Sequence, residues 1–353
     1  MVYSSIFLAS VPSLAIIAIG YLSVLLNVMQ LESMQNINGF LVNFCLPALM
    51  FRLVVNLDLS SVQLSYVYCS LLHRLGSLIF AAISSFSIRR LPYFLNISPN
   101  VFIFATFSTL VWTNSIIIGL PVAQVLFGTP SLDYLVISGA LDTIMLLPIS
   151  ILLLGQKTSQ TSLSRYLFRS IFTSFSIMSV IIGTLFKIIL KKIPFVINQF
   201  LIYLGQAVTG GCLFIVGMFF FKQIKELNQS KIEIIIPTEI IEAPAPTPVE
   251  EEITIKMVDD PQTRAFFIYC FVSRLIFSPF LMFIITKLIK VSQPITSYLM
   301  YSVCLPLAIA CFSVSKQFNK ATSGINYVLI VTHLLIVPLL VIYSFIFKFE
   351  VVE

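Results

Sequence analysis

Charged residues are scarce in this sequence of 353 residues: they make up 10% of it, whereas hydrophobic residues make up 58%. A soluble domain carries about 25% charged residues, so this chain has too few to cover a surface that faces water. The mean hydropathy is +1.01. These shortages exclude an ordinary soluble protein and indicate an all-α protein that lies largely within a bilayer.

The patterns of enzyme and metal sites are also missing. The sequence contains no P-loop, no GxSxG and no HExxH motif, and no paired carboxylates within an apolar run. The six cysteines lie in apolar runs without CxxC or Cys/His spacing, which is typical of packing residues: Cys45, Cys69, Cys212, Cys270, Cys304 and Cys311. We therefore expect no enzyme activity, no cofactor and no metal.

The formal net charge of +6 does not indicate a nucleic-acid partner. The Lys and Arg residues stand singly or in pairs between apolar runs, where such residues anchor the ends of membrane helices. If the N-terminus faces outward, twelve basic residues fall in cytoplasmic connections and six on the outer side. This count favours an orientation with both termini outside.

What the sequence has is a series of apolar runs, each about 20 residues long and sufficient to cross a bilayer as a helix. The predicted membrane helices span residues 4–28, 35–56, 63–87, 100–127, 131–155, 165–189, 194–221, 263–289, 294–315 and 325–348. The first run is too long for the apolar part of a signal peptide, so we interpret it as a membrane helix.

One connection differs from the others. Residues 222–262 are rich in Glu and Pro and contain nine acidic residues. This composition is typical of a disordered linker, and we expect an extramembrane loop there, not a second domain.

A weak internal repeat relates the two halves of the chain. The segment GCLFIVGM beginning at Gly211 resembles FCLPALMF beginning at Phe44, and three further pairs follow in the same order. Each half, residues 1–155 and 156–353, then holds five helices, and an odd number places the halves in opposite orientations. The sequence predicts ten transmembrane helices in two inverted five-helix repeats, an arrangement typical of secondary transporters.

The fourth and ninth predicted helices are interrupted in matching places. Pro121 lacks a backbone N–H and Gly119 adds backbone freedom, so together they are expected to break helix 4 at mid-membrane. Pro306 occupies helix 9, and Asn114 is a polar side chain near the first break. Because a broken helix exposes the N-terminus of its second half, such a site attracts anions. The alternative is a harmless kink whose free backbone groups are satisfied by neighbouring helices.

Three charged residues within the predicted membrane helices are candidate site residues. Arg74 and Arg274 occupy equivalent places in helices 3 and 8 and are candidates for recognising an anionic group, although Arg274 also lies near enough to a helix end to snorkel. Asp142 in helix 5 is either a proton-coupling carboxylate or the permanent partner of a basic residue.

Other polar residues are weaker candidates. Pro47 should kink helix 2, and Asn43 precedes it by about one turn; we include both as candidate substrate-binding residues. His73 and His333 are interpreted as hydrogen-bonded packing residues, and Arg52 as an interface anchor.

The motifs NFCLPALMF from Asn43, the Asn114, Gly119 and Pro121 spacing in helix 4, and LGQAVTGGCLFIVGM from Leu204 together resemble the auxin efflux carrier family, the PIN-like transporters. The resemblance covers nearly the whole chain. It implies the ten-helix fold with helices 4 and 9 crossing, organic anions bound at that crossing, and a dimer with a second copy. By resemblance, Asn114, Gly119 and Pro121 belong to the crossing.

Two functional hypotheses follow. The first is a secondary carrier for a small organic anion, such as an auxin-like carboxylate, working by alternating access at the helix 4/9 crossing. The second is a membrane sensor that keeps the carrier fold but binds a lipid such as a sterol. From the sequence, the membrane that holds the protein is that of the endoplasmic reticulum, that of the endolysosomal system or the plasma membrane.

Overall fold

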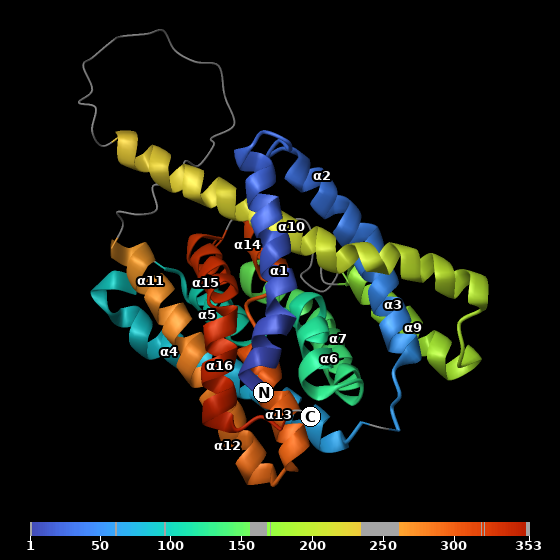
Figure 1. The fold of residues 1–353 in the computed structure, drawn as a ribbon. Helices are drawn as coiled ribbons and strands as arrows, with labels where there is room; N and C mark the ends of the chain where they lie inside the picture. Colours follow the sequence, from blue (N-terminus) through green and yellow to red (C-terminus); the bar gives the residue numbers. More distant parts are fainter. Residues whose placement is uncertain are drawn as a thin grey trace.

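The computed structural model describes residues 2–60, 62–94, 97–155, 168–169, 171–233, 261–318, 320 and 322–350. Across these residues the chain is helical, and the β-structure is confined to one antiparallel bridge between Thr113 and Leu307 (Figure 1). The predicted all-α class is confirmed.

Helical elements follow one another along the described part of the chain. They are α1 (Val2–Leu25), α2 (Ser33–Phe40), η1 (Leu41–Cys45), α3 (Leu46–Asn56), α4 (Leu64–Ser87), η2 (Ile88–Arg90), η3 (Pro92–Phe94), α5 (Pro99–Val111), η4 (Ser115–Gly119), α6 (Leu120–Phe127), α7 (Pro130–Leu154), α9 (Phe175–Leu190), α10 (Phe195–Glu233), α11 (Pro261–Val272), η5 (Ser273–Phe277), α12 (Ser278–Ile289), α13 (Gln293–Cys304), α14 (Ile309–Gln317), α15 (Thr322–Leu334) and α16 (Ile336–Phe347).

Six helical stretches in the described part of the chain are long and apolar enough to cross a membrane. They are Ile6–Leu25, Ser33–Asn56, Leu64–Arg90, Pro130–Leu154, Phe195–Lys225 and Pro261–Ile289. The pair Gly324–Leu334 and Ile336–Phe347 is bent by 73° and makes a seventh if it counts as one span. Shorter apolar helices are Pro99–Val111, Ser115–Phe127 and Phe175–Leu190. Of the predicted helix 165–189, residues 165–167 and 170 lie outside the described residues, and α9 begins at Phe175.

The predicted disordered linker begins later than expected. Helix α10 continues past residue 221 to Glu233, so the first residues of the predicted loop are helical. The reason is local: residues 222–233 are rich in Lys, Glu and Gln, which favour helix even where the chain has left the apolar region. Residues 234–260 lie outside the described part.

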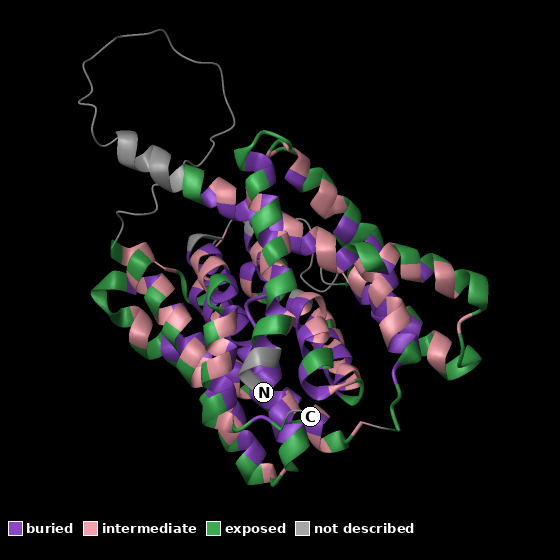
Figure 2. Ribbon diagram, in the orientation of Figure 1, coloured by how far each residue is buried: buried purple, intermediate pink, exposed green. Residues whose placement is uncertain are grey.

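The helices form two groups. In one, α1 packs along α10, α10 packs on α3, and α3 packs on α9. In the other, α4 packs on α5 and α12, α11 on α15, and α13 on α16. Helix α1 begins and α16 ends at the same end of the molecule, whereas α10 ends and α11 begins at the opposite end (Figure 1). Outward faces are exposed (Figure 2), and many large hydrophobic side chains lie on them, as expected for helices in lipid.

Three π-helical segments among the described residues share one sequence feature. The segments η1, η4 and η5 are each followed two residues later by a proline: Pro47, Pro121 and Pro279. A proline ring clashes with the carbonyl four residues back, and a wider turn relieves that clash without breaking the helix. The prolines therefore predict local widening of the helix, and the breaks lie elsewhere.

Candidate functional site

Two broken helices meet in the second helix group. Helix α5 ends at Val111 and η4 restarts the helix at Ser115; helix α13 ends at Cys304 and α14 restarts at Ile309. The two extended segments, residues 112–114 and 305–308, lie antiparallel and are called the crossing below. The Asn114 N–H donates to the Pro306 carbonyl at 2.8 Å. The Ala308 N–H donates to the Trp112 carbonyl at 3.1 Å. Each break thus satisfies backbone groups of the other.

The first break lies further toward the N-terminus than predicted. Gly119 and Pro121 were expected to make it, but Gly119 is helical, with φ −62° and ψ −48°, and Pro121 lies in the first turn of α6. The chain instead leaves the helix at Trp112, with φ −74° and ψ 99°. The π-turn of η4 accommodates Pro121, so no break is needed there. Pro306 lies inside the second break, as the sequence indicated.

Arg274 joins the two broken helices. This side chain on η5 is 2% exposed, and its guanidinium donates to the carbonyls of Thr109 on α5 and Leu305 beside α13. Both carbonyls lie at the C-terminal end of a helix, where the last carbonyls have no hydrogen-bond partner within the helix. A cation there also complements the negative ends of two helix dipoles. Arg274 is therefore committed to the backbone of the crossing and does not snorkel.

The C-terminal end of α5 accepts a further side-chain hydrogen bond. Ser278 Oγ donates to the Leu110 carbonyl at 3.1 Å. His73 Nε2 lies 3.1 Å from Ser278 Oγ, and since that hydroxyl proton is already donated, Nε2 carries the proton of this bond. His73 is thus a hydrogen-bonded packing residue, as predicted.

Asn114 is the hinge of the first crossing helix. It is 3% exposed, and its carbonyl accepts the Gly119 N–H at 2.9 Å, which begins the second half-helix. Its Nδ2 lies 3.3 Å from Nε2 of His333 on α15. Nδ1 of His333 lies 2.8 Å from the Leu329 carbonyl and must donate to it, so Nε2 accepts from the Asn114 amide. His333 thus holds Asn114 in place.

Gly119 permits the close approach of the second broken helix. A Cβ at this position would lie 2.7 Å from Leu305 Cδ1. The Gly119 carbonyl accepts from the Tyr301 hydroxyl at 2.9 Å. On the opposite side of the crossing, the Leu307 N–H donates to Thr332 Oγ1 at 3.2 Å.

Asp142 and Arg74 form a buried ion pair beside the crossing. Arg74 Nη2 and Nε lie 2.6 and 3.1 Å from Asp142 Oδ1. Arg74 also donates to the carbonyls of Ser70 and Ser138, at 2.9 and 3.1 Å. Asp142 Oδ2 is buried and makes no hydrogen bond within the described residues, although the carboxylate lies near the Thr113 backbone. Asp142 is thus paired with Arg74, an arrangement that a proton-coupling carboxylate and a permanent partner both allow.

The crossing therefore brings together Asn114, Gly119, Pro306 and Arg274, and Pro121 lies beyond η4 in the first turn of α6. Arg74 and Asp142 lie beside it through α7. Asn43 and Pro47 do not join it: Asn43 is exposed on η1, and both belong to the other helix group. Arg52, also in that group, bonds Asn198 Oδ1 at 3.2 Å.

Four residues that support the crossing were not predicted as site residues from the sequence: His333, Thr332, Tyr301 and Ser278. Histidine is rare within membrane helices, so its presence in an apolar run could have indicated His333 as a site residue. The three hydroxyl residues did not, because Ser, Thr and Tyr are common in such helices and bond their own backbone.

The arrangement places positive potential at the crossing. The first N–H groups of a restarted helix have no partners within it, and the second half of helix α5–α6 begins at the crossing. Two arginines add positive charge, and one of them is offset by Asp142. The described residues contain no cluster of three or more His, Cys, Asp or Glu that could hold a metal.

The family model described as membrane transport protein matches residues 5–344, nearly the whole chain. The chain belongs to this membrane transport protein family. The resemblance to auxin efflux carriers is thereby confirmed, and membership together with the long apolar helices identifies an integral, multi-pass membrane protein.

The chain is also similar to the mouse lysosomal cholesterol signaling protein. The two are 23% identical over 248 residues, which cover 67% of this chain and 28% of the mouse protein. The chain therefore spans less than a third of that relative's length.

Proposed function

We propose that this member of the family is a secondary carrier for a small organic anion, such as an auxin-like carboxylate, and that the substrate binds at the crossing. The observation that carries the proposal is the meeting of two broken helices, since half-helix ends at mid-membrane are the usual substrate sites of inverted-repeat transporters. Asn114 supplies a neutral polar contact, and the N-terminus of η4 supplies positive potential.

Arg74 and Asp142 supply the coupling in this scheme. Arg74 is engaged by Asp142 while that carboxylate is charged. When Asp142 takes up a proton, Arg74 is released to pair with a substrate carboxylate, because a neutral acid no longer attracts the guanidinium. Substrate binding and proton binding are then linked, and Asp142 is the proton-coupling residue.

Transport proceeds by movement of one helix group against the other. In this proposal the ten predicted helices form two inverted five-helix repeats, and the group that contains α4, α5 and α11–α13 rocks against the group that contains α1, α3 and α10. Helices α6 and α7 pack on η4, and α7 also packs on α5, so both belong to the group of α4 and α5. Contacts between the groups are made chiefly by α1 with α6 and α16, and by α7 with α3 and α9. A second copy of the chain is the expected oligomeric partner.

The direct test is uptake and efflux by purified protein in liposomes, with a panel of labelled carboxylates. We expect at least one carboxylate to be transported, and a proton gradient to change its rate. Asn114→Ala should reduce this transport, whereas Asn36→Ala, on the exposed face of α2, should not. Absence of transport for every carboxylate, or equal rates for both variants, would contradict the carrier proposal.

The second candidate is a lipid-binding sensor with a carrier fold. It is favoured by one observation: an apolar groove lies between α4 and the α11–α12 region on the outer face of the molecule. The mouse relative's name refers to cholesterol signaling. Lipid binding by a protein that transports none of the carboxylates would select this candidate.

A further inference from the structure

The imidazole of His333 on α15 is held in a single protonation state. The residue is 0% exposed. Its Nδ1 lies 2.8 Å from the Leu329 carbonyl, an atom that can only accept, so Nδ1 carries a proton. A second proton on Nε2 would place a further charge inside the packed membrane helices, where burial of a charge is costly. The neutral ring therefore presents Nε2 as an acceptor.

This acceptor decides how the Asn114 amide is turned. Asn114 Nδ2 lies 3.3 Å from His333 Nε2, and only the NH₂ end of the amide can donate to it. The amide oxygen Oδ1 is therefore turned away from the imidazole. An Asn at the start of a helix usually turns this oxygen to the N–H of the second or third residue, but Asn114 at the start of η4 makes no such side-chain bond. Within the described residues, Oδ1 has no donor.

A buried acceptor without a donor favours a ligand that supplies one. Asn114 is 3% exposed, and an unsatisfied polar group in such a place costs free energy that a substrate N–H or O–H would recover. The first N–H groups of the half-helix that begins at Ser115 have no partners within that helix and attract a carboxylate. The crossing thus presents backbone donors and, beside them, one side-chain acceptor.

The pair of Asn114 and His333 lies where the two helix groups meet. The His333 ring packs edge-on against Phe220 of α10, with ring centroids 6.5 Å apart, and α10 also packs on η4. Helix α10 belongs to the group of α1 and α3, whereas the crossing belongs to the group of α4 and α5. A substrate bound at Asn114 would therefore lie between the two groups, as alternating access requires.

We propose that His333 sets the substrate class of the crossing: by turning the Asn114 amide so that Oδ1 is free, it selects carboxylates that also carry an N–H or O–H donor. The carboxylate lies at the start of η4, and the second donor bonds to Asn114 Oδ1. His333 does not touch the substrate and is a positioning residue that acts through Asn114. The inference rests on the carrier proposal and names the substrate class for that site.

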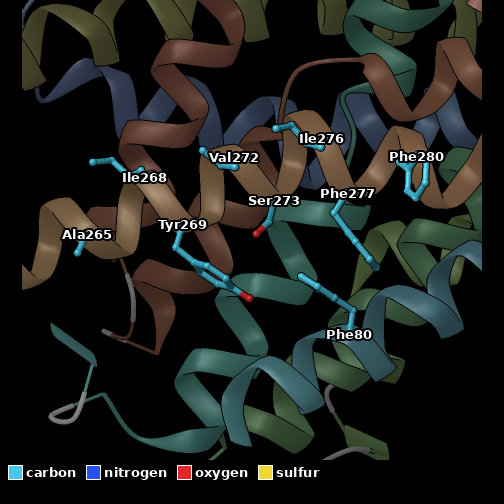
Figure 3. A pocket seen from close by; sticks show the side chains of 9 residues that line it. All are labelled: Phe80, Ala265, Ile268, Tyr269, Val272, Ser273, Ile276, Phe277 and Phe280. Atoms are coloured by element: carbon cyan, nitrogen blue, oxygen red, sulfur yellow. The ribbon is translucent and has the colours of Figure 1, made fainter. Parts of the chain in front are cut away.

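The apolar groove between α4 and α11–α12 should have the opposite preference. Figure 3 shows the side chains that line it, of which Ile268, Ile276 and Phe280 are 56%, 64% and 57% exposed. Phe277 reaches across to Phe80 on α4, and their rings stack with centroids 3.7 Å apart. Because this lining is almost wholly apolar, replacing a ligand N–H by N–methyl should strengthen binding there. Preference for the donor thus separates binding at the crossing from binding in the groove.

The test uses pairs of carboxylates that differ in one donor: indole-3-acetate with 1-methylindole-3-acetate, and 4-hydroxyphenylacetate with 4-methoxyphenylacetate. Transport by purified protein in liposomes gives the KM of each compound, and displacement of a labelled carboxylate in detergent gives its Kd. In at least one pair, we expect the donor-bearing compound to have a KM and a Kd at least about tenfold lower, because a site that bonds a donor rejects an analogue without it.

Three substitutions separate positioning from folding. His333→Asn keeps a donor near the Leu329 carbonyl but places no atom where Nε2 lies, so the Asn114 amide can turn and the preference should largely disappear. Binding of the methylated compound should stay within about twofold of the unaltered protein, because that compound makes no bond to Oδ1. His333→Gln returns an acceptor near the Nε2 position and should restore part of the preference. The matched control is His73→Asn, since His73 bonds Ser278 and not Asn114, and it should keep the preference in full.

The outcomes distinguish this inference from the carrier proposal. Equal affinity within both pairs, or tighter binding of the methylated compounds, overturns the inference while transport of any carboxylate keeps the carrier proposal standing. A preference that persists in folded His333→Asn overturns the role of His333. If no carboxylate binds or is transported, the carrier proposal fails and this inference fails with it.

Discussion

The two halves of the molecule use their buried arginines differently. In the first half, Arg74 on α4 pairs with the Asp142 carboxylate on α7, with the closest atoms 2.6 Å apart. In the second half, Arg274 on η5 donates to the main-chain carbonyls of Thr109 and Leu305. Both side chains are almost fully buried, at 5% and 2% exposure, so the difference lies in their partners.

The repeat suggests why the partners differ. Asp142 stands four residues before Leu146, and the segment that echoes Leu146 onward begins at Ile336, four residues after Thr332. In the proposed repeat, the second half has a threonine where the first has an acid, and this Thr332 accepts from the Leu307 backbone. Without a carboxylate to pair with, Arg274 is bound to the carbonyls of the crossing. The first half contains a buried ion pair, and the second contains an arginine that binds two backbone carbonyls.

The largest effect should come from breaking the ion pair. Arg74→Leu leaves the Asp142 charge buried without a partner, and loss of one partner of such a pair costs about 3–5 kcal/mol of stability. Adding Asp142→Leu should recover most of that loss, because two apolar side chains replace a matched pair. Thermal unfolding in detergent measures both variants. If the double variant is no more stable than Arg74→Leu, the pair is not the main partner of either residue.

The second arginine should behave differently. Arg274→Lys keeps the charge but cannot reach both carbonyls, and a buried carbonyl left without a donor costs about 1–3 kcal/mol. Adding Asp142→Asn should give no recovery, since Asp142 is not the partner of Arg274. Recovery of stability in that double variant, measured by thermal unfolding, would show that the two halves share one charge network.

A smaller effect is expected where the two broken helices touch. Gly119→Ala places a methyl group against Leu305, and overpacking of this kind costs about 1–3 kcal/mol. Transport should fall, because the crossing must shift. Gly39→Ala on α2 is the matched control, since nothing lies within 4 Å of its added Cβ. Equal transport by the two variants in liposomes would show that this contact does not position the site.

The smallest change in stability should come from the prolines. Pro121→Ala allows the π-turn before it to tighten into α-helix, so stability should stay equal or rise by less than about 1 kcal/mol. Transport should nevertheless fall, since the backbone at the crossing is displaced. Pro306→Ala should act in the same way if both breaks contribute to the site. Normal transport by Pro121→Ala, or a loss caused by unfolding, would contradict this role.

The sequence by itself determined the all-α membrane class and the place of the second break. Apolar runs of about 20 residues, a shortage of charge and prolines in matching helices are local properties, so they can be counted along the chain. They predicted an all-α membrane protein, the placement of Pro306 in a break and the burial of Asp142. The resemblance carried by Asn114, Gly119 and Pro121 pointed to the correct family.

Only the tertiary structure decided the partners. Arg74 and Asp142 are 68 residues apart, Arg274 and Thr109 are 165 apart, and Asn114 and His333 are 219 apart. No local pattern predicts which of several buried donors will meet a given acceptor, because that depends on how the helices pack. The position of the first break has the same cause. Proline allows either a π-turn or a break, and the pairing of residues 112–114 with residues 305–308 decided where the helix ends.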